Sequence, residues 1–239
     1  MNALRGYSAQ QVRDAEAPHL AAGEPLMARA AAALAAVCEE LLTDQGLRLA
    51  HSRVLMLIGG GNNGGDALFA AAHLAKARVT VELVRTSSRV HEEGLAAALA
   101  AGSAMITDAP AKLAARAKSA DLIVDGILGT GTSPDPRLRG DARELVAAIA
   151  PMVEERSGSP AVVAVDIPSG IHPDTGAVPD PAAVLHADVT VTFGGAKAGL
   201  LLEPARGFVG ELRVHEIGLA ADLEKLTPLV VIPGASSTE

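Results

Sequence analysis

Two aspartates stand where apolar runs end, and each places a carboxylate at the mouth of an expected crevice. Asp125 follows the run 122–124, and Asp166 follows the run 161–165. A carboxylate in such a place is poorly solvated and needs a ligand, a cation or backbone donors to stay charged. A simple loop-capping role would explain one such aspartate about as well. Two in parallel positions favour a functional site.

A glycine-rich octet, residues 59–66, reads Gly-Gly-Gly-Asn-Asn-Gly-Gly-Asp between an apolar run and a helical pattern. Glycines permit close backbone approach, so several N–H groups can converge on an anion near a helix start. This predicts phosphate binding, although the two asparagines and the early aspartate interrupt the dinucleotide fingerprint and the P-loop lysine is absent. The alternative is a tight turn in which Asp66 caps the next helix. That alternative explains Asp66 but not the number of glycines.

Asn63, Asp125 and Ser169 supply three oxygen ligands from three loops. With one carboxylate among them, the set favours a monovalent ion such as K⁺ over a tightly held divalent ion. Ser169 has no glycine two residues before it, so a nucleophilic serine of the hydrolase type is disfavoured. The seven histidines are scattered without a pair at ligand spacing, and surface or capping roles are expected for them.

The composition limits the possible partners. The chain has 239 residues, 49% of them hydrophobic, which suits one large α/β domain with a sizeable core. With three Phe, one Tyr, no Trp and a net charge of -8, it offers neither stacking platforms nor a basic surface, so no nucleic-acid partner is expected. The single cysteine, Cys38, is expected to be a buried thiol. No signal-peptide pattern or membrane span is visible, so we expect a cytoplasmic protein with no membrane partner.

The pattern after residue 53 predicts the scaffold that positions these residues. Short apolar runs alternate with Ala-rich helical segments, which is typical of βαβ units and a parallel sheet covered on both faces. The expected strands are 54–58, 79–84, 122–124, 161–165 and 189–193, with 211–217 as an edge strand. The expected helices are 66–76, 92–101 and 141–150, with 8–19 and 25–42 before the first strand. The loops 59–66, 125–135, 166–170 and 194–197 should then meet at the carboxyl edge of the sheet, where ligands bind.

Four segments, 59–66, 121–131, 163–176 and 190–197, resemble in the same order the NAD(P)H-hydrate epimerase family, the YjeF N-terminal domain. Segments 8–16 and 25–30 resemble the helices that open this family's domain, so the likeness covers nearly the whole chain. The resemblance implies a single domain, residues 1–233, with a Rossmann-like three-layer α/β/α sandwich and a mostly parallel central sheet. Residues 234–239 are expected to be a flexible end.

The resemblance also implies an activity and its cofactor. The expected enzyme is an isomerase that interconverts the R and S forms of NAD(P)H-hydrate at C6 of the nicotinamide ring, in nicotinamide nucleotide repair. It implies a homodimer that binds K⁺ through Asn63, Asp125 and Ser169. An ADP- or ATP-dependent NAD(P)H-hydrate dehydratase, for which this chain is too short, is the expected functional partner.

The resemblance assigns Asp166 to the reacting nicotinamide end, where we expect it to act as the catalytic acid and base. The other residues expected around the substrate line its phosphates and ribose. They are Asn62, Asn63, Gly64, Gly65, Asp66, Gly129, Thr130, Gly131, Thr132, Ser133, Pro134 and Asp135.

The sequence departs from the family's pattern at some positions, and two other functions were weighed against the epimerase. Ala67 and Ala28 stand where the family commonly has Gly and Glu, and the loop after Gly131 is rich in proline. One rival is a non-catalytic nucleotide-binding or scaffold module, which has no need of the oxygen-bearing residues. The other is an NAD-dependent oxidoreductase, which the absence of an acidic residue at 84–86 disfavours.

Overall fold

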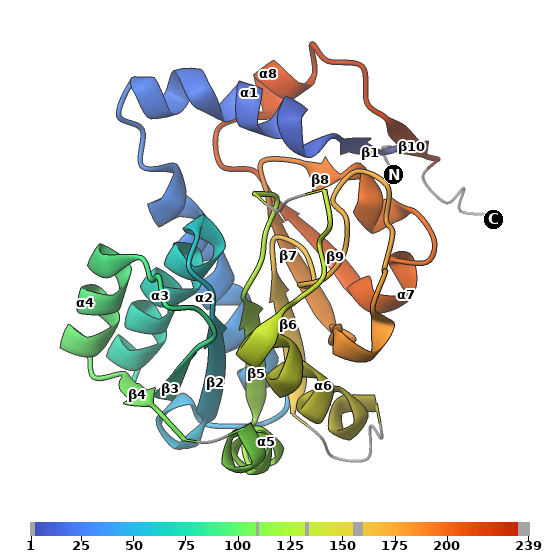
Figure 1. Ribbon diagram of the computed structural model, residues 1–239. Coiled ribbons are helices and arrows are strands. Elements are labelled where there is room, and N and C mark those ends of the chain that lie inside the picture. The colour runs from blue at the N-terminus through green and yellow to red at the C-terminus, as the bar shows by residue number, and fades with distance from the viewer. Residues whose placement is uncertain (1–2, 109, 132–133, 155–159, 234–239) are drawn as a thin grey trace, which may run out of the picture.

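The computed structural model describes residues 3–108, 110–131, 134–154 and 160–233 (Figure 1). Its frame is a seven-stranded sheet in the order β4-β3-β2-β5-β6-β7-β9, in which each neighbouring pair is parallel. The strands are β2 (Arg53–Ile58), β3 (Thr80–Arg85), β4 (Ala104–Ile106), β5 (Leu122–Gly126), β6 (Ala161–Val165), β7 (Val189–Phe193) and β9 (Glu211–His215). The chain winds from β2 to one side, then returns to continue on the other side. This leaves a switch point between β2 and β5, where a crevice forms.

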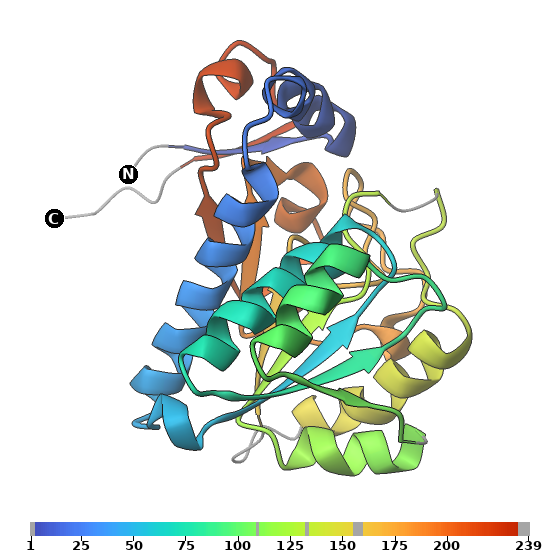
Figure 2. The same ribbon diagram turned by 90° about the vertical axis from the view of Figure 1, so that its left-hand side faces the viewer.

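Helices cover both faces of the sheet, as Figure 2 shows. They are α2 (Leu26–Asp44), α3 (Asn62–Lys76) and α4 (Glu92–Ala100) on one face, and α5 (Pro110–Lys118) and α6 (Gly140–Glu154) on the other. Strand β2 shows why its residues are apolar without interruption. Val54 and Met56 pack into the cluster that contains α2 and α3, whereas Leu55 and Leu57 pack into the cluster that contains α5 and α6. The three-layer α/β/α fold predicted from the sequence is therefore confirmed.

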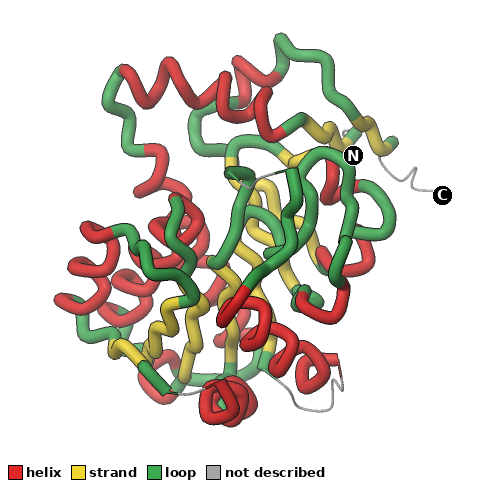
Figure 3. The backbone as a smooth tube through the Cα atoms, viewed as in Figure 1, coloured by secondary structure: helices red, strands yellow, loops and turns green. Residues whose placement is uncertain are grey.

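A second, three-stranded sheet lies beside the carboxyl edge of the large one (Figures 1 and 3). Strand β1 (Leu4–Tyr7) pairs antiparallel with β10 (Val230–Ile232) and parallel with β8 (Ala196–Lys197). Helices α1 (Ala9–Ala21) and α8 (Ala220–Leu223) lie next to it, and the short helix α7 (Arg206–Val209) precedes β9. The expectation that two helices precede the first strand is therefore wrong. A four-residue strand whose partners, β8 and β10, lie far along the chain leaves no periodic signal.

The expected strands and helices are present, with corrections at several places. Strand β4 and helix α5 were not expected from the sequence. Asp125 lies inside β5 rather than after it, because the backbone continues its pairing with β6 to that residue. Helix α3 begins at Asn62 with Gly61 as its N-cap, so the alternative in which Asp66 caps the helix is wrong. The prediction for 234–239 falls outside the described residues.

The N-terminal helices follow ordinary helix chemistry. Ser8 and Gln11 form a capping box at the start of α1. Cys38 in α2 is fully buried, and burial raises the pKa of its thiol to about 12, as expected for an inert structural thiol. Among the large apolar side chains of α2, Leu26, Leu34, Val37 and Leu42 are buried and Met27 and Leu41 are half-buried, so only alanines among its apolar residues are exposed. No helix in the described ranges is both long and apolar enough to cross a membrane.

Candidate active site at the carboxyl edge

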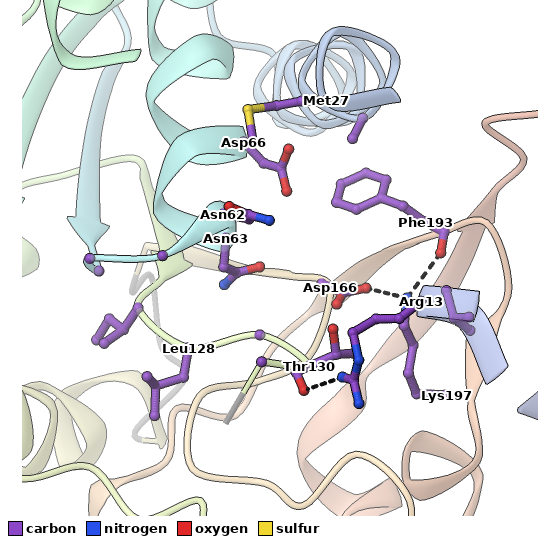
Figure 4. A pocket seen from close by; sticks show the side chains of 18 of the residues that line it. Arg13, Met27, Asn62, Asn63, Asp66, Leu128, Thr130, Asp166, Phe193 and Lys197 are labelled. Atoms are coloured by element: carbon purple, nitrogen blue, oxygen red, sulfur yellow. Dashed lines mark hydrogen bonds and ion pairs between the residues drawn. The ribbon is translucent and has the colours of Figure 1, made fainter. Parts of the chain in front are cut away.

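A cavity of about 790 Å³ opens at the carboxyl edge of the sheet, within the usual range of about 300–1,000 Å³ for ligand sites. Its walls come from the glycine loop after β2, the loops after β3, β5 and β6, the end of β7, and helices α1 and α2. Figure 4 shows the labelled side chains of Asp66, Asp166 and Lys197 around this space. The topological switch point therefore carries the cavity, as the parallel sheet predicts.

Asp166 lies directly after β6 with a backbone φ of 65°, a left-handed conformation that aspartate tolerates better than most residues. Its N–H donates to the carbonyl of Val191 at 2.7 Å, which ties this turn to the neighbouring strand β7. Its side chain accepts a hydrogen bond from Thr192 Oγ1 at 3.0 Å. The sharp turn keeps the carboxylate at the cavity wall, where Asp166 is 8% exposed. Strain of this kind often marks functional positions.

Lys197 is the residue that most changes the site relative to the sequence-based expectation. Its ammonium is buried and donates to Asp166 Oδ1 at 2.5 Å, Thr192 Oγ1 at 3.1 Å and the carbonyl of Phe193 at 2.9 Å (Figure 4). The charge of Asp166 is thus balanced inside the wall. Lys197 is the last residue of segment 190–197, and the sequence pattern predicts no role for it. The available signal was a lysine within an otherwise apolar stretch, since such a cation needs a buried partner.

Asp125 and Ser169 form a tight unit beneath the cavity. Ser169 Oγ donates to Asp125 Oδ1 at 2.6 Å, and Ser169 N–H donates to Asp125 Oδ2 at 2.8 Å. Both residues are 1% exposed. Burial raises the pKa of Asp125, and the hydrogen bonds from Ser169 and Ile127 oppose that rise. In the described part of the chain no basic side chain forms an ion pair with this carboxylate.

Asn63 approaches the same loop from helix α3. A Cβ added to Gly129 would lie 2.9 Å from Asn63 Oδ1, so the amide lies directly against that glycine. Leu128 N–H, one residue earlier, donates to Ser169 Oγ at 2.8 Å. The loop after β5 therefore brings the residues expected to bind the cation into one neighbourhood. Asn63 Nδ2 is buried and has no hydrogen-bond partner in the described part of the chain.

The glycine loop and the start of α3 are packed so closely that Gly59 and Gly64 are required. A Cβ on Gly59 would lie 1.8 Å from the carbonyl oxygen of Ile127, and a Cβ on Gly64 would lie 2.2 Å from that of Gly59. Asn62, Asn63 and Asp66 line the cavity. Gly64 and Gly65 do not, because they lie in the first turns of α3 and are buried against neighbouring loops. Their role is to let the wall form.

Three further polar side chains line the wall: Asp66 and Glu16, whose pKa values burial raises, and Arg13. Burial raises the pKa of Asp66 well above its usual range, and the charges of Asp166 and Glu16 raise it further. Burial also raises the pKa of Glu16. Arg13 donates to the carbonyl of Thr130 at 3.0 Å and so joins α1 to the loop after β5. Nothing in the helical pattern 8–19 distinguishes Glu16 and Arg13 from solvent-facing residues.

The segment 129–135 is placed in part. Gly129, Thr130, Gly131 and Asp135 line the cavity. Pro134 is exposed and does not line it, and Thr132 and Ser133 fall outside the described residues. Arg137 and Arg139 both bind the Asp135 carboxylate, and the hydrogen bonds from Arg137 lower its pKa to about 2.

The sheet is parallel and doubly wound, with a glycine loop at its switch point and the Asp166 carboxylate after β6. This arrangement defines a Rossmann-like, nucleotide-binding class of α/β protein. Residues 23–199 match the family described as YjeF-related protein N-terminus. The chain is 53% identical to the NAD(P)H-hydrate epimerase of Clavibacter michiganensis subsp. michiganensis, over 94% of both chains. The chain therefore belongs to the YjeF-related N-terminal domain family.

A longer relative and a solved structure add to these comparisons. It is 38% identical to the bifunctional NAD(P)H-hydrate repair enzyme Nnr of Mycobacterium tuberculosis, over 80% of this chain but 37% of that protein. The crystal structure of yeast ynu0, YNL200c, shares the fold with a TM-score of 0.74 at 19% identity, covering 96% of this chain and 100% of that one. One domain of this kind thus occurs both alone and as part of a longer chain.

Proposed function

We propose that the protein is an NAD(P)H-hydrate epimerase, an isomerase of nicotinamide nucleotide repair. The observation that carries this proposal is the 53% identity with an epimerase over 94% of both chains. The cavity supports it independently, because an ionisable pair, Asp166 and Lys197, lies at one end and a glycine loop beside a helix N-terminus lies at the other. Such a loop favours the phosphates of a dinucleotide.

The chemistry needs a proton at one oxygen atom. In the hydrate, C6 carries a hydroxyl beside ring nitrogen N1, and the nitrogen lone pair expels that hydroxyl as water once an acid protonates it. Water then adds to the other face of the planar iminium, loses a proton to a base and gives the other epimer. The acid and the base can be the same group, because the proton given in the first step is recovered in the second.

Asp166 fills this role in our proposal, with Lys197 as its positioning residue. The proton between Lys197 Nζ and Asp166 Oδ1 can move onto the carboxylate, which then acts as the acid at the cavity wall. When Asp166 passes this proton to the leaving hydroxyl, Lys197 is left as a neutral amine, and the proton recovered from the added water restores the ammonium and carboxylate pair. Thr192 Oγ1 holds the same oxygen and limits rotation of the side chain.

Asn63, Asp125 and Ser169 fit K⁺, which we propose as the cofactor. The buried carboxylate of Asp125 lacks a cationic partner in the described part of the chain, so a monovalent ion would balance its charge. Ser169 Oγ uses its proton on Asp125 and one lone pair on Leu128 N–H, which leaves one lone pair for an ion. The bound ion would supply positive charge that orders the loop after β5 beneath the substrate.

The test is conversion of purified (R)-hydrate to (S)-hydrate, measured against a protein-free blank because the epimers also interconvert spontaneously. We expect Asp166→Asn to lower the enzymatic rate about 100-fold or more, the usual size of an acid–base contribution. Asparagine tolerates the left-handed backbone, so the turn should survive. The control is Asp44→Asn, at the exposed end of α2 and outside the cavity wall. A near wild-type rate in Asp166→Asn contradicts the assignment.

The same assay separates the rivals. A nucleotide-binding or scaffold module would bind NADP⁺ without accelerating epimerisation, and an oxidoreductase would exchange hydride with an added substrate. We also propose a cytoplasmic location and a functional link to an ADP- or ATP-dependent NAD(P)H-hydrate dehydratase, since the S epimer has to be passed on. Both follow from the proposed substrate, a damaged form of a coenzyme used in the cytoplasm.

A further inference from the structure

The loop after β3 forms a wall of the cavity that the proposed chemistry does not use. Thr86, Ser87 and Arg89 line the cavity on the side away from Asp166. Thr86 N–H and Thr86 Oγ1 both donate to the carbonyl of Ile58, at 2.9 and 3.0 Å, which fixes the loop to the end of β2. A Cβ added to Gly60 would lie 2.8 Å from Ser87 Oγ and 3.1 Å from Arg89 Cβ. The loop and the glycine loop are therefore direct neighbours.

Arg89 is unusual among the cations that line the cavity. Arg137 and Arg139 are bound to Asp135, Lys197 is bound to Asp166, and Arg13 donates to Thr130 and Gln10. In the described part of the chain, the Arg89 guanidinium has neither an ion pair nor a hydrogen bond. Arg89 is exposed beside the cavity, so its guanidinium is accessible to an anionic ligand from solution.

The loop also lacks any acceptor suited to a free ribose hydroxyl. Residues 85–91 read Arg-Thr-Ser-Ser-Arg-Val-His and include no acidic side chain. Ser87 Oγ accepts a hydrogen bond from Arg89 N–H at 3.2 Å, so its own proton remains available to a ligand. Guanidinium and hydroxyl donors together suit a phosphate group.

The sheet order indicates which phosphate of a dinucleotide would lie at Ser87 and Arg89. In doubly wound dinucleotide sites the strand next to the glycine-loop strand ends at the adenosine ribose, where an acidic residue binds a 2′-hydroxyl and an arginine accommodates a 2′-phosphate. Strand β3 holds that position beside β2. Asp166 follows β6, three inter-strand spacings or about 14 Å from β3. A dinucleotide with its nicotinamide at Asp166 and its phosphates at the glycine loop thus carries its adenosine to Ser87 and Arg89.

We propose that Ser87 and Arg89 form a subsite for the 2′-phosphate of the adenosine ribose, so that the enzyme prefers the hydrate of NADPH to that of NADH. The orientation of the nicotinamide rests on the proposed function. The subsite itself does not, because it recognises the adenosine half of the ligand.

Calorimetric titration with adenosine fragments tests the subsite without the reaction. The ligands are 5′-AMP, adenosine 2′,5′-bisphosphate and adenosine 3′,5′-bisphosphate, the last with the same phosphates but one at the wrong position. We expect the 2′,5′ compound to bind about 10-fold or more tightly than either of the others, the size of a hydrogen-bonded charge contact. Arg89→Ala should remove that preference and leave 5′-AMP affinity unchanged. Arg48→Ala, an exposed arginine outside the cavity wall, should keep it.

Several outcomes would overturn the subsite. The first is equal affinity for the two bisphosphates, and the second is no binding of either. The third is a preference for the 2′,5′ compound that survives Arg89→Ala and disappears in Arg137→Ala. Epimerase assays with the two hydrates then separate the two proposals. A protein with the 2′-phosphate preference but no epimerase activity keeps the subsite and loses the proposed function. An active enzyme that treats both hydrates alike keeps the function and loses the subsite.

Discussion

Lys197 is buried against Asp166, and each is the other's counter-ion. Lys197→Met fills the space but leaves a carboxylate in the wall without its cation. Removing one partner of a buried ion pair costs about 3–5 kcal/mol, and the open side of Asp166 favours the lower value. We expect the free energy of unfolding, measured in urea, to fall by about 3 kcal/mol. Epimerase activity should be lost at the same time.

The double variant Asp166→Asn with Lys197→Met removes both charges and so tests whether the pair is coupled. Its loss of stability should be smaller than the sum of the two single losses. Strict additivity would show that the two groups do not act on each other. Lys225→Met is the matched control, because Lys225 forms an exposed pair with Asp222 and should change stability by at most about 1 kcal/mol.

Asp66 makes the stability of the fold depend on pH. Burial raises the pKa of Asp66 above the model-peptide value of 3.8, with smaller contributions from the charges of Asp166 and Glu16. For an acid with a raised folded-state pKa, the stabilising contribution is complete below pH 3.8 and is lost as pH rises through the higher value. Ionisation of the Asp66 carboxyl therefore destabilises the folded state.

Asp66→Asn removes that charge, and in the described part of the chain Asp66 makes no side-chain hydrogen bond that would be lost with it. The melting temperature of Asp66→Asn should exceed that of the wild type at pH 8, and the difference should shrink toward pH 4. Differential scanning calorimetry across this range measures it, with Asp44→Asn as the exposed control. A difference that does not change with pH would contradict the assignment.

At the scale of elements, the junction between β2 and α3 depends on the absence of side chains. In Gly64→Ala the new methyl group meets the backbone of Gly59 at 2.2 Å, which no rotamer can relieve. We expect a loss of about 2–3 kcal/mol, the usual size for overpacking, together with weaker NADP⁺ binding as the loop shifts. Chemical denaturation and calorimetric titration report the two effects.

Gly61→Ala is the matched control in the same loop. A Cβ there has no heavy atom within 4 Å, and the residue has an ordinary extended φ of -109°. Alanine is a poorer N-cap than glycine, so a loss below about 1 kcal/mol is expected. If both variants behave alike, close packing is not the reason for the glycines.

At the scale of the whole molecule, the homodimer expected from the resemblance stays a prediction, but its original reason changes. Helix α2 keeps its large apolar side chains buried or half-buried within the chain, so its exposed apolar surface consists of alanines alone. Exposed apolar side chains instead occur on β1, β9 and β10, at Leu4, Val214 and Val231. We expect a dimeric mass by light scattering at micromolar concentration. A monomeric mass would count against the dimer.

The sequence by itself determined the central strands of the large sheet, because β2, β5 and β6 are buried on both faces and are therefore apolar over nearly their whole length. It also determined that Asp125, Asp166 and the glycine octet share one edge, because parallel strands end on the same side. These conclusions need only local periodicity and the geometry of βαβ units. The helical pattern 8–19 likewise predicted α1, whose start is capped by Ser8 in the structure.

Only the tertiary structure decided the small sheet, the pairing of Lys197 with Asp166, and the raised pKa values of Asp66 and Glu16. Strands β1, β8 and β10 are too short for a pattern, and each is stabilised by a partner far along the chain. Lys197 pairs with Asp166, 31 residues earlier in the chain, because of the turn at Asp166, and periodicity in the sequence does not predict that turn. The pKa of Asp66 depends on its burial and on the charges of Asp166, Glu16 and Lys197, which come from distant parts of the chain. Such properties belong to the assembled cavity, because burial and Coulomb interactions arise only when distant segments meet.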